Sequence, residues 1–370
     1  MEAQPGALSA EQILDLIRTG ALAGSGSLAA RVQPCSLDLT LDKELWRMPA
    51  SVLPLAGERV ADIIAQYARG TLDLSTPQIL ERGKVFIARL AECCSLPAWL
   101  GAYTNNKSSI GRLDVQTRTL CDGNPRYDKI PRGHAGPLYL EITPRSFDLH
   151  LQVGCSLNQA IFYGRRQVLD TEALEDLCSR EALAYDRSGR VLPPEELSID
   201  AGLLLSVDFD QPIVGYVARN TTEAVSIVAG CTKDGALFFD PIPHPKDGRL
   251  LLRKGHFYVF STREFVRIPP EYAVEMLPHE TSAGEFRAHY AGFFDPGFGW
   301  SPAGSGRGTP AVLEVRPYDD DIILRHGQPI CKMAYERMAR APLQPYGASG
   351  VGSHYNGQRG PRLSRFLGSP

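Results

Sequence analysis

The sequence predicts a mainly β protein built from two related domains in tandem. Three observations lead to this prediction. Short runs of alternating apolar and polar residues recur from residue 32 onward, which is typical of strands. Glycine and proline, at 35 and 28 of 370 residues, are spread along the chain and indicate many turns. Finally, Pro137–Pro144 (PLYLEITP) matches Pro310–Pro317 (PAVLEVRP), which reveals an internal repeat.

The repeat extends well beyond this segment. Gly83–Pro97 aligns with Gly255–Pro269 at an offset of 172 residues. At an offset of 173, three further residues recur without a gap: Asp148 falls on Asp321, Leu151 on Leu324 and Gly154 on Gly327. Solenoid repeats have periods of roughly 20 to 50 residues, so a repeat of this length indicates a duplicated domain.

Few helices are expected. Ser9 and Gln12 fit a capping box that starts a short amphipathic helix, and Thr171–Tyr185 is a second helix candidate. Strands are expected at Ser36–Leu41, Lys84–Arg89, Leu138–Ile142 and His256–Phe260. We therefore expect a first domain with its N-terminal helix at 1–168, a helical linker at 169–195, a second domain at 196–340 and a C-terminal tail at 341–370.

The composition excludes several classes of partner. A net charge of -3 provides no overall basic field for nucleic acid or an anionic membrane. No apolar run approaches the roughly 20 residues of a membrane span, and the N-terminus lacks the basic and apolar regions of a signal peptide. The eight cysteines are scattered, which suits reduced thiols. We expect a soluble cytoplasmic protein without nucleic-acid or membrane partners.

A cluster of polar residues at Asn106–Arg112 could bind phosphate. Lys107, Ser108, Ser109 and Arg112 offer the hydroxyls and cationic groups that make charge-assisted hydrogen bonds to a polyphosphate. The alternative is a solvated turn, which the spacing alone favours.

Two further patterns could contribute to a nucleoside site. Phe293–Trp300 combines Asp295, a tight turn and several aromatic residues, although it also fits a hairpin tip whose aromatics belong to the core. Glu141 and Glu314 occupy matching places in the repeat, each within an apolar strand. A carboxyl group that faces a closed pocket gains a raised pKa suited to acid–base chemistry, whereas one on a solvated face has no such role.

The C-terminal tail from Tyr346 to Pro361 carries aromatic, imidazole and amide groups that could close over a ligand, or it could be a disordered terminus. The sequence contains no GxxxxGK[ST] motif, no GxGxxG followed by an acidic residue after a strand, and no zinc-deaminase signature. The histidines and cysteines have no metal-ligand spacing, so we expect no zinc and no protein-bound metal.

Taken in order, these segments resemble the dCTP deaminase branch of the trimeric dUTPase-like superfamily, in its long form with two tandem domains. Val32–Leu39 resembles the early family motif, and Lys107–Arg112 the phosphate motif. The second copy carries Asp295-Pro296-Gly297 and the catalytic strand Val312-Leu313-Glu314, and His354–Gln358 resembles the nucleotide-closing tail. The resemblance implies two dUTPase-like β-barrel or jelly-roll domains with a few short helices.

Each copy lacks what the other keeps. The first copy has Pro131-Arg132-Gly133 in place of Asp-Pro-Gly, and in the second copy Ser108 and Arg112 fall on Glu280 and Gly284. Sites of this superfamily combine the two kinds of motif from neighbouring subunits. The resemblance therefore implies one composite site, with Glu141 as a relic or a secondary site.

The implied reaction is hydrolytic, zinc-independent deamination of dCTP to dUTP and ammonia, in pyrimidine deoxynucleotide synthesis leading to dUMP and dTTP. Glu314 would be the general acid and base, and Mg²⁺ would be bound with the triphosphate. The resemblance assigns catalytic roles to Glu314, Ser108, Arg112 and, as the competing carboxylate, Glu141. It assigns substrate contacts to Lys107, Ser109, Asp295, Gly297, Val312, Leu313, Tyr346, His354 and Gln358.

Two alternatives are open. The first keeps the fold but makes the protein a dUTP diphosphatase or a bifunctional enzyme that forms dUMP. Phe298 in place of a tyrosine and a tail poor in glycine argue against it, and the glycine-rich Ala303–Gly308 is better explained as a hairpin insertion. The second is a non-catalytic nucleotide-binding regulator. The family also implies a homo-oligomer with three-fold domain packing, and dTTP or dUTP as a regulator or product.

Overall fold

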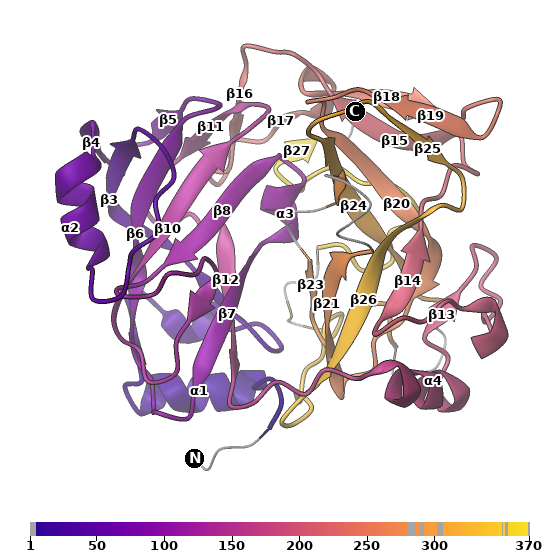
Figure 1. Cartoon of the computed structure of the whole chain (residues 1–370), viewed down its shortest axis with the longest axis horizontal. Helices are drawn as coiled ribbons and strands as arrows, with labels where there is room; N and C mark the ends of the chain where they lie inside the picture. Colours follow the sequence, from indigo (N-terminus) through magenta and orange to yellow (C-terminus); the bar gives the residue numbers. More distant parts are fainter. Residues whose placement is uncertain are drawn as a thin grey trace. The chain divides into compact units, whose positions relative to one another are not determined.

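The computed structural model describes residues 5–279, 286–288, 292–301, 306–349, 351 and 354–368. The chain divides into two compact units (Figure 1). Unit 1 comprises Met1–Arg165, Asn220–Phe238 and Ser364–Pro370, and unit 2 comprises Arg166–Arg219 and Phe239–Leu363. Both units consist mainly of strands with a few short helices, which confirms the predicted fold class.

The described part of unit 1 contains three larger sheets and the two-stranded sheet β17-β27. The largest has the strand order β4-β3-β6-β10-β8, with β1 beside β6; the other larger sheets are β2-β12-β7-β9 and β16-β11-β5. The strands are β1 (Leu22–Ala23), β2 (Leu37–Leu39), β3 (Leu41–Met48), β4 (Gly70–Asp73), β5 (Gln78–Leu80), β6 (Val85–Ser95), β7 (Gly101–Asn106), β8 (Val115–Leu120), β9 (Lys129–Ile130), β10 (Ala135–Pro144), β11 (Asp148–Leu151), β12 (Asn158–Tyr163), β16 (Ala224–Ser226), β17 (Lys233–Asp234) and β27 (Leu367–Gly368). The helices are α1 (Ala10–Arg18), α2 (Val60–Tyr67) and α3 (Ser108–Gly111), with short 3-10 turns at Leu28–Arg31 and Gly235–Leu237.

Unit 2 repeats this plan. Its main sheet has the order β18-β15-β20-β24-β22, with β13 beside β20, and its second sheet is β14-β26-β21-β23. The elements are α4 (Thr171–Arg180), β13 (Ala184–Tyr185), β14 (Leu203–Ser206), β15 (Ile213–Ala218), β18 (Phe239–Pro243), β19 (Arg249–Leu252), β20 (Tyr258–Val266), β21 (Tyr272–Pro278), β22 (Phe286–Ala288), β23 (Phe293–Phe294), β24 (Thr309–Pro317), β25 (Ile322–Arg325) and β26 (Pro329–Arg337), with a 3-10 turn at Pro194–Glu196. Strand pairing in the two units therefore confirms the duplication.

Equivalent side chains make equivalent contacts in the two copies. Asp148 accepts a hydrogen bond of 2.8 Å from the backbone N–H of Arg82, and Asp321 accepts one of the same length from Lys254. Asp321 follows Asp148 by 173 positions, and Lys254 follows Arg82 by 172 positions. The same contact is therefore made in both copies. The repeat that is visible in the sequence is also a repeat of local structure.

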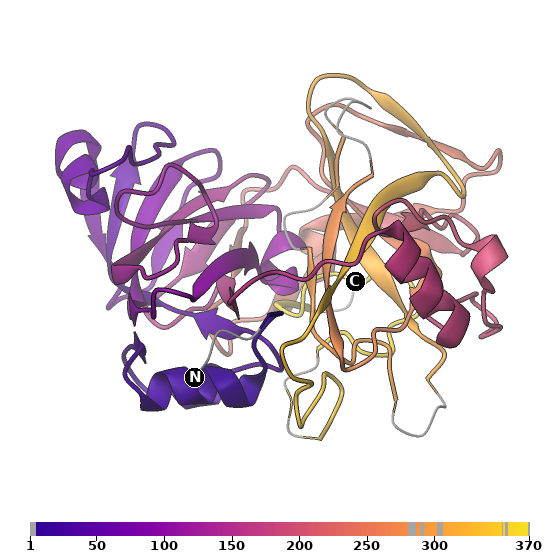
Figure 2. The same cartoon turned by 60° about the horizontal axis from the view of Figure 1, so that its bottom comes forward.

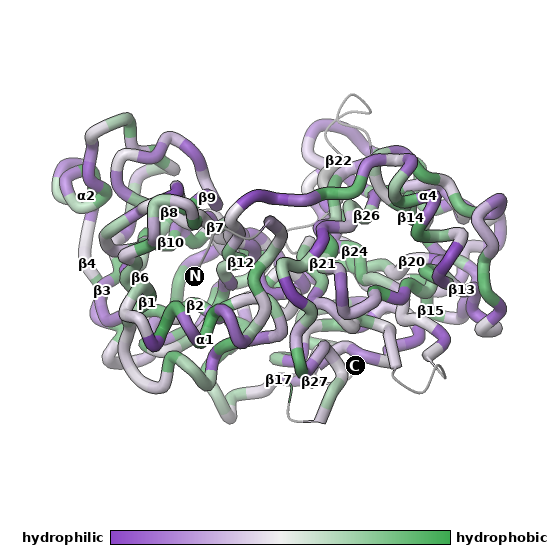
Figure 3. The backbone as a smooth tube through the Cα atoms, turned by 90° about the horizontal axis from the view of Figure 1, so that it is seen from below, coloured by the Kyte–Doolittle hydropathy of each residue, from purple (hydrophilic) through white to green (hydrophobic). Residues whose placement is uncertain are grey.

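Helix α1 begins where the sequence predicts. Ser9 and Gln12 form both hydrogen bonds of the capping box, and Ile13 and Leu16 are buried. In Figure 3 the tube at α1 alternates between green and purple, as expected for an amphipathic helix. Figure 2 shows this indigo helix lengthwise, outside the strands of unit 1.

The second predicted helix is too long. Helix α4 ends at Arg180 because Glu181 has an extended backbone, and Ala184–Tyr185 forms strand β13 with Phe265 and Val266 of β20. Residues 186–195 are a compact turn, in which the carboxylate of Asp186 accepts hydrogen bonds from the backbone N–H groups of Ser188 and Arg190. The tertiary pairing of β13 thus overrides local helix propensity.

Unit 1 also contains two segments from later parts of the sequence, Asn220–Phe238 and Ser364–Pro370. Strand β16 pairs in parallel with β11, and the C-terminal β27 pairs in parallel with β17. The domains expected from the sequence are continuous stretches of chain, so the first of them does not include these later segments.

The core of unit 2 places the residues of β24 on two faces. Ala311, Leu313 and Val315 belong to the hydrophobic core of unit 2, together with Phe260 of β20. Because side chains alternate along a strand, Val312 and Glu314 lie on the opposite face. Of the helices in the described ranges, none has the length and apolar character needed to span a membrane.

Candidate active site

The predicted phosphate cluster lies at the turn between β7 and β8 in unit 1. Lys107 caps the single-turn helix α3, and its N–H donates to the carbonyl of Leu157 at 3.0 Å. Ser109 and Arg112 are buried, with 4% and 3% of their surfaces exposed, so this segment is not a solvated turn. Ile110, also buried, anchors α3 on its apolar side.

The turn after α3 is fixed by Asp114. This residue has a φ of 57°, a left-handed conformation that is unfavourable for residues other than glycine. Its carboxylate accepts a hydrogen bond of 2.6 Å from the hydroxyl of Ser146, and its carbonyl accepts one from the N–H of Arg145. These contacts hold the chain in the conformation that leads from α3 into β8.

Sequence reasoning missed a charged partner of the cluster. The ammonium of Lys107 forms an ion pair with Asp38 on β2, which also accepts a hydrogen bond of 3.4 Å from Gln33. Asp38 is the one acidic residue of the early motif Val32–Leu39. This was the signal in the sequence that could have pointed to a charged partner for the cluster. In unit 2 the strand register places Leu204 at the corresponding position, so the second copy has no equivalent carboxylate.

Glu141 lies on β10 in unit 1 and is 1% exposed. Its Oε1 accepts a hydrogen bond of 2.8 Å from Nε of Arg118, which is its cross-strand neighbour on β8, and another of 3.2 Å from Ser51. The guanidinium of Arg118 also lies 4.1 Å from the ring centre of Tyr127. Glu141 is therefore held in a local ion pair that its own unit supplies.

A second carboxyl group, on the half-buried Asp128, lies near this pair. Asp128 accepts hydrogen bonds of 2.9 Å from the N–H of Thr119 and from the hydroxyl of Thr104. Burial raises the pKa of Asp128 to about 6, although these hydrogen bonds and Arg118 act in the opposite direction.

Glu314 lies on β24 in unit 2 and is 2% exposed. It is directly opposite Val259 of β20, which is fully buried. A carboxyl group in such surroundings is shielded from bulk water on a rigid central strand.

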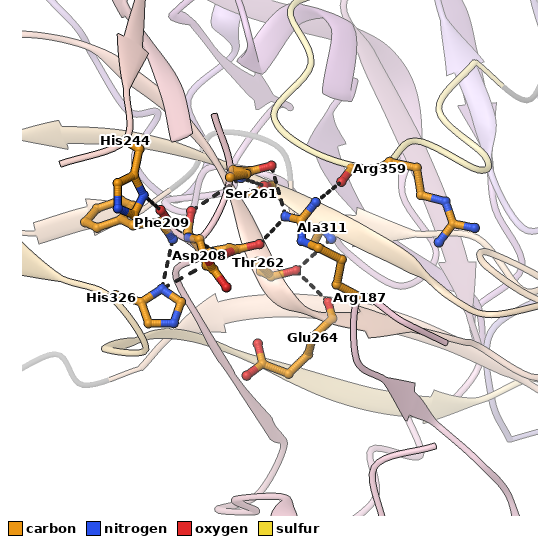
Figure 4. Close-up of polar contacts among 12 residues, drawn as sticks. Arg187, Asp208, Phe209, His244, Ser261, Thr262, Glu264, Ala311, His326 and Arg359 are labelled. Carbon is orange, nitrogen blue, oxygen red and sulfur yellow. Dashed lines mark hydrogen bonds and ion pairs between the residues drawn. The ribbon is translucent and has the colours of Figure 1, made fainter. Parts of the chain in front are cut away.

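The start of β24 is fixed by an irregularity in its neighbour β20. The pairing register shifts between Ser261 and Phe265. The hydroxyl of Thr262 fills the gap, since it accepts the N–H of Ala311 at 2.9 Å and donates to the carbonyl of Glu264 at 2.8 Å (Figure 4). A bulge at this point sets the direction of the strand that carries Glu314.

The Asp295-Pro296-Gly297 turn follows β23. Gly297 has a φ of 96°, and a Cβ atom there would lie 2.7 Å from Cβ of Pro345. Only glycine fits this conformation and spacing. The N–H of Tyr346 donates to the carbonyl of Pro296 at 2.7 Å, and the ring of Phe298 lies 5.8 Å from that of Tyr346. The turn and the tail therefore form one packed structure in unit 2.

The tail continues across the start of β24. The backbone N–H of Tyr355 donates to the hydroxyl of Tyr346 at 3.2 Å. The buried side chain of Gln358 donates to the carbonyl of Pro310 at 2.8 Å. His354 is exposed and its ring contacts Tyr355 edge to face.

An arginine holds the end of this stretch. Arg187 forms an ion pair with the buried Asp208 and donates to the side chain of Gln211 at 3.0 Å and to the carbonyl of Arg359 at 3.3 Å (Figure 4). The guanidinium groups of Arg187 and Arg359 both lie over the ring of Phe265. Sequence analysis missed Arg187, which lies in the segment expected to be a linker.

Each unit thus gathers part of the predicted set. In unit 1, Lys107, Ser108, Ser109 and Arg112 lie within six consecutive positions of one turn. In unit 2, the Asp295–Gly297 turn contacts Tyr346, and Gln358 contacts Pro310 at the start of β24, the strand that carries Val312 and Glu314, whereas the side chain of Leu313 packs in the core. The repeat equivalents Glu280 and Gly284, and Ala303–Ser305 of the glycine-rich segment, lie outside the described residues. Within the described ranges, no three His, Cys, Asp or Glu side chains gather as metal ligands.

Two family models match consecutive parts of the chain. Residues 4–166 match the N-terminal domain of 2'-deoxycytidine 5'-triphosphate deaminase, and residues 171–367 match its C-terminal domain. A crystal structure of 2'-deoxycytidine 5'-triphosphate deaminase from Agrobacterium tumefaciens is 37% identical in sequence and superposes with a TM-score of 0.86. That match covers 95% of this chain and 100% of the other.

Shorter proteins match part of the chain. The dCTP deaminase, dUMP-forming, of Bifidobacterium longum (strain DJO10A) is 30% identical over 195 residues, which are 51% of this chain and 93% of that protein. The dCTP deaminase, dUMP-forming, of Mycobacterium avium (strain 104) is 35% identical over 125 residues, which are 33% of this chain and 61% of that protein.

Proposed function

Because the chain belongs to the 2'-deoxycytidine 5'-triphosphate deaminase family, we propose that it deaminates dCTP hydrolytically in the synthesis of deoxyuridine nucleotides. The observation that carries this proposal is that the chain matches both family domains in order, over residues 4–166 and 171–367. The reaction adds water to C4 of cytosine and releases the amino group as ammonia.

Glu314 is the proposed proton carrier. It takes a proton from the water that attacks C4 and delivers it to N3, and it then transfers the proton of the new C4 hydroxyl to the departing amine, which leaves as ammonia. One carboxyl group can both accept and donate a proton when its charged form is not strongly favoured. Burial disfavours the charged form. The 2% exposure of Glu314 and its place on a central strand support this assignment.

Glu141 is not the proposed proton carrier, because its copy lacks the Asp-Pro-Gly turn. Its Oε1 already accepts hydrogen bonds from Arg118 and Ser51, and its ion pair must be broken before it can exchange protons with a substrate. The cost of separating such a buried pair is several kcal/mol. We therefore propose that Glu141 stabilises unit 1 and that Glu314 transfers the protons in deamination.

Ser108 and Arg112 are proposed to orient the attacking water and to stabilise developing charge. Lys107 and Ser109 are proposed to hold the triphosphate together with Mg²⁺. The donor set fits such a metal, because Oδ1 of Asp38 is buried without a hydrogen-bond partner among the described residues and can accept from a metal-bound water. When bound, Mg²⁺ neutralises phosphate charge.

We propose that these two groups of residues serve one site. The support comes from the sequence: the first copy keeps the Ser-Ser…Arg motif and lacks Asp-Pro-Gly, whereas the second copy keeps Asp295-Pro296-Gly297 and lacks the phosphate motif. Two independent sites would each be incomplete. Asp295 is proposed to contact the sugar, and Tyr346, His354 and Gln358 to close over the nucleotide.

A second candidate keeps the deamination and adds hydrolysis of the triphosphate to give dUMP and pyrophosphate. The observation that favours it is that the similar proteins from Bifidobacterium longum and Mycobacterium avium are dUMP-forming enzymes. The substitution of Phe298 for the expected tyrosine favours dUTP as the product.

One experiment separates the candidates. Purified protein is incubated with dCTP and Mg²⁺, and ammonia, dUTP, dUMP and pyrophosphate are quantified by chromatography over the same time course. Ammonia with an equal amount of dUTP supports the main proposal. Ammonia with dUMP and pyrophosphate, and no lag that would indicate free dUTP, supports the second candidate. Binding of dCTP without any product would contradict both and indicate a regulator.

A further inference from the structure

Unit 1 contains a cavity of about 590 Å³ beside the phosphate cluster. Its lining includes three cationic side chains, Arg31, Lys107 and Arg365, and one carboxylate, Asp38. Residues 152–156 and 226–230 form much of the remaining wall. Arg31 is ion-paired with Glu92 and Lys107 with Asp38, and Arg365 adds a third cationic group to the wall. Cationic side chains around a cavity of this size suit an anion with several charges.

Arg365 belongs to the last seven residues of the chain, which are part of unit 1. These residues are fixed to the phosphate cluster by Ser364. Its hydroxyl donates a hydrogen bond of 2.6 Å to the backbone carbonyl of Ser109, and Ser364 is 1% exposed. The two residues are separated by 255 positions in the sequence. The contact therefore ties the C-terminal segment to α3 itself.

Further contacts define the direction of the segment. The N–H of Phe366 donates to the hydroxyl of Ser364 at 3.3 Å, and the N–H of Leu367 donates to its carbonyl at 3.0 Å. Leu367 and Gly368 then pair with Lys233 and Asp234 as strand β27. Because Ser364 is anchored on one side and β27 on the other, Arg365 and Phe366 are presented to the cavity between two fixed points.

Polar atoms in the cavity wall match the needs of a phosphate. The guanidinium of Arg365 lies 4.9 Å from the ring centre of Phe366, which restricts its orientation. The hydroxyl of Ser156, another lining residue, is buried and has no hydrogen-bond partner among the described residues. It can donate to a phosphate oxygen, and a buried hydroxyl without such a partner is costly.

We propose that Ser364 and Arg365 complete the polyphosphate-binding part of the site, Arg365 as a phosphate-binding residue and Ser364 as a positioning residue that fixes the backbone of Ser109. This inference rests on the proposed function for the identity of the substrate, which brings a triphosphate to the cluster Lys107–Arg112. It extends the set of ligands to a segment far outside that motif. The chemistry recognised is an inorganic or nucleoside polyphosphate.

The test uses the full-length protein and inorganic tripolyphosphate with Mg²⁺ as the probe, by titration calorimetry, together with steady-state kinetics on dCTP. The variants are Arg365→Gln and Ser364→Ala. The control is Arg18→Gln, which removes an exposed arginine of α1 whose side chain is 76% exposed and does not line the cavity. Thermal unfolding establishes that each variant is folded.

We expect Arg365→Gln to weaken tripolyphosphate binding and to raise KM for dCTP by about tenfold or more, with kcat within about twofold of wild type. Ser364→Ala should raise KM in the same way but less, since the cationic group remains. Arg18→Gln should change neither quantity.

Two results would overturn the inference: wild-type protein that does not bind tripolyphosphate, or an Arg365→Gln variant that binds it as wild type does. An equal loss in the Arg18→Gln control would also overturn it, because the effect would then be one of net charge. Tripolyphosphate binding that depends on Arg365, in a protein that does not turn over dCTP, would support the inference while contradicting the proposed function.

Discussion

The side-chain amide of Gln358 donates a hydrogen bond of 2.8 Å to the backbone carbonyl of Pro310, four residues before Glu314 on the same strand. The tail is thereby attached to the strand that carries the proposed proton carrier. Gln358 is 7% exposed, so the bond is shielded from water. A tail that closes over a nucleotide from this position would be coupled to the geometry of β24.

Replacing Gln358 by Ala should weaken the closed tail. The change leaves the carbonyl of Pro310 without its side-chain donor, which costs about 1–3 kcal/mol when such a group is buried. We expect KM for dCTP to rise at least fivefold, measured by ammonia release under steady-state conditions. Asn356→Ala, at an exposed amide two residues away, is the matched control and should leave KM unchanged. An equal rise in both variants would argue against a specific role for the Gln358 contact.

Replacing Gly297 by Ala should destabilise unit 2. The new Cβ would lie 2.7 Å from Cβ of Pro345 and 2.8 Å from the backbone nitrogen of Tyr346, in a left-handed conformation. Gly255→Ala is the control, because it has a similar φ of 74° and nothing within 4 Å of the added Cβ. We expect Gly255→Ala to cost about 1–2 kcal/mol and Gly297→Ala clearly more, by chemical denaturation. Equal losses would show that the contact with the tail is unimportant.

Replacing Arg112 by Lys should impair the chemical step. Lysine keeps the positive charge but loses the planar fork that can orient two partners at once. We expect kcat for ammonia release to fall by about 100-fold to 1000-fold, the usual effect of removing one well-placed donor. Arg145→Lys, at an exposed arginine in the same unit, should retain nearly full activity. If the Arg112→Lys variant kept its kcat, Arg112 would have no role in the reaction beyond binding.

Replacing Asp128 by Asn should change how stability depends on pH. Burial raises the pKa of Asp128 to about 6 in the folded protein. The folded state therefore favours the protonated form, and the stability contributed by this group is present below about pH 4 and lost as the pH rises through 6. Asparagine stays neutral and can still accept the hydrogen bonds of Thr119 and Thr104.

The Asp128→Asn variant should match wild type near pH 4 and exceed it at pH 7 by up to about 3 kcal/mol. Urea denaturation at pH 4, 5, 6 and 7 measures this difference. A gap between the two proteins that stays constant with pH would mean that the folded state does not raise the pKa of Asp128.

The sequence was sufficient to predict the duplicated plan, because the repeat places Asp148 and Asp321 at equivalent points and both make the same backbone contact. It was also sufficient for the start of α1, since a capping box depends only on Ser9 and Gln12. Both predictions rest on spacing within a short window or on an ungapped comparison of two such windows.

The ion pair between Lys107 and Asp38 and the bond from Ser364 to Ser109 were not predicted. They join residues that are 69 and 255 positions apart, and no local pattern marks either of them. The same holds for Arg187, whose partners Asp208 and Arg359 are brought to it by strand pairing and by the path of the tail. Composition had suggested a linker at Arg187 because charge and turn residues are also typical of linkers.

The central claim is that Glu314, and not its repeat equivalent Glu141, transfers protons in deamination. The direct measurement is the initial rate of ammonia release from saturating dCTP by the Glu314→Gln and Glu141→Gln variants, each shown to be folded by its thermal transition. Glu314→Gln should lose a factor of at least about 100 in kcat, the scale of general acid–base catalysis, while Glu141→Gln keeps most of the wild-type rate. Retained activity in Glu314→Gln together with its loss in Glu141→Gln would contradict the account.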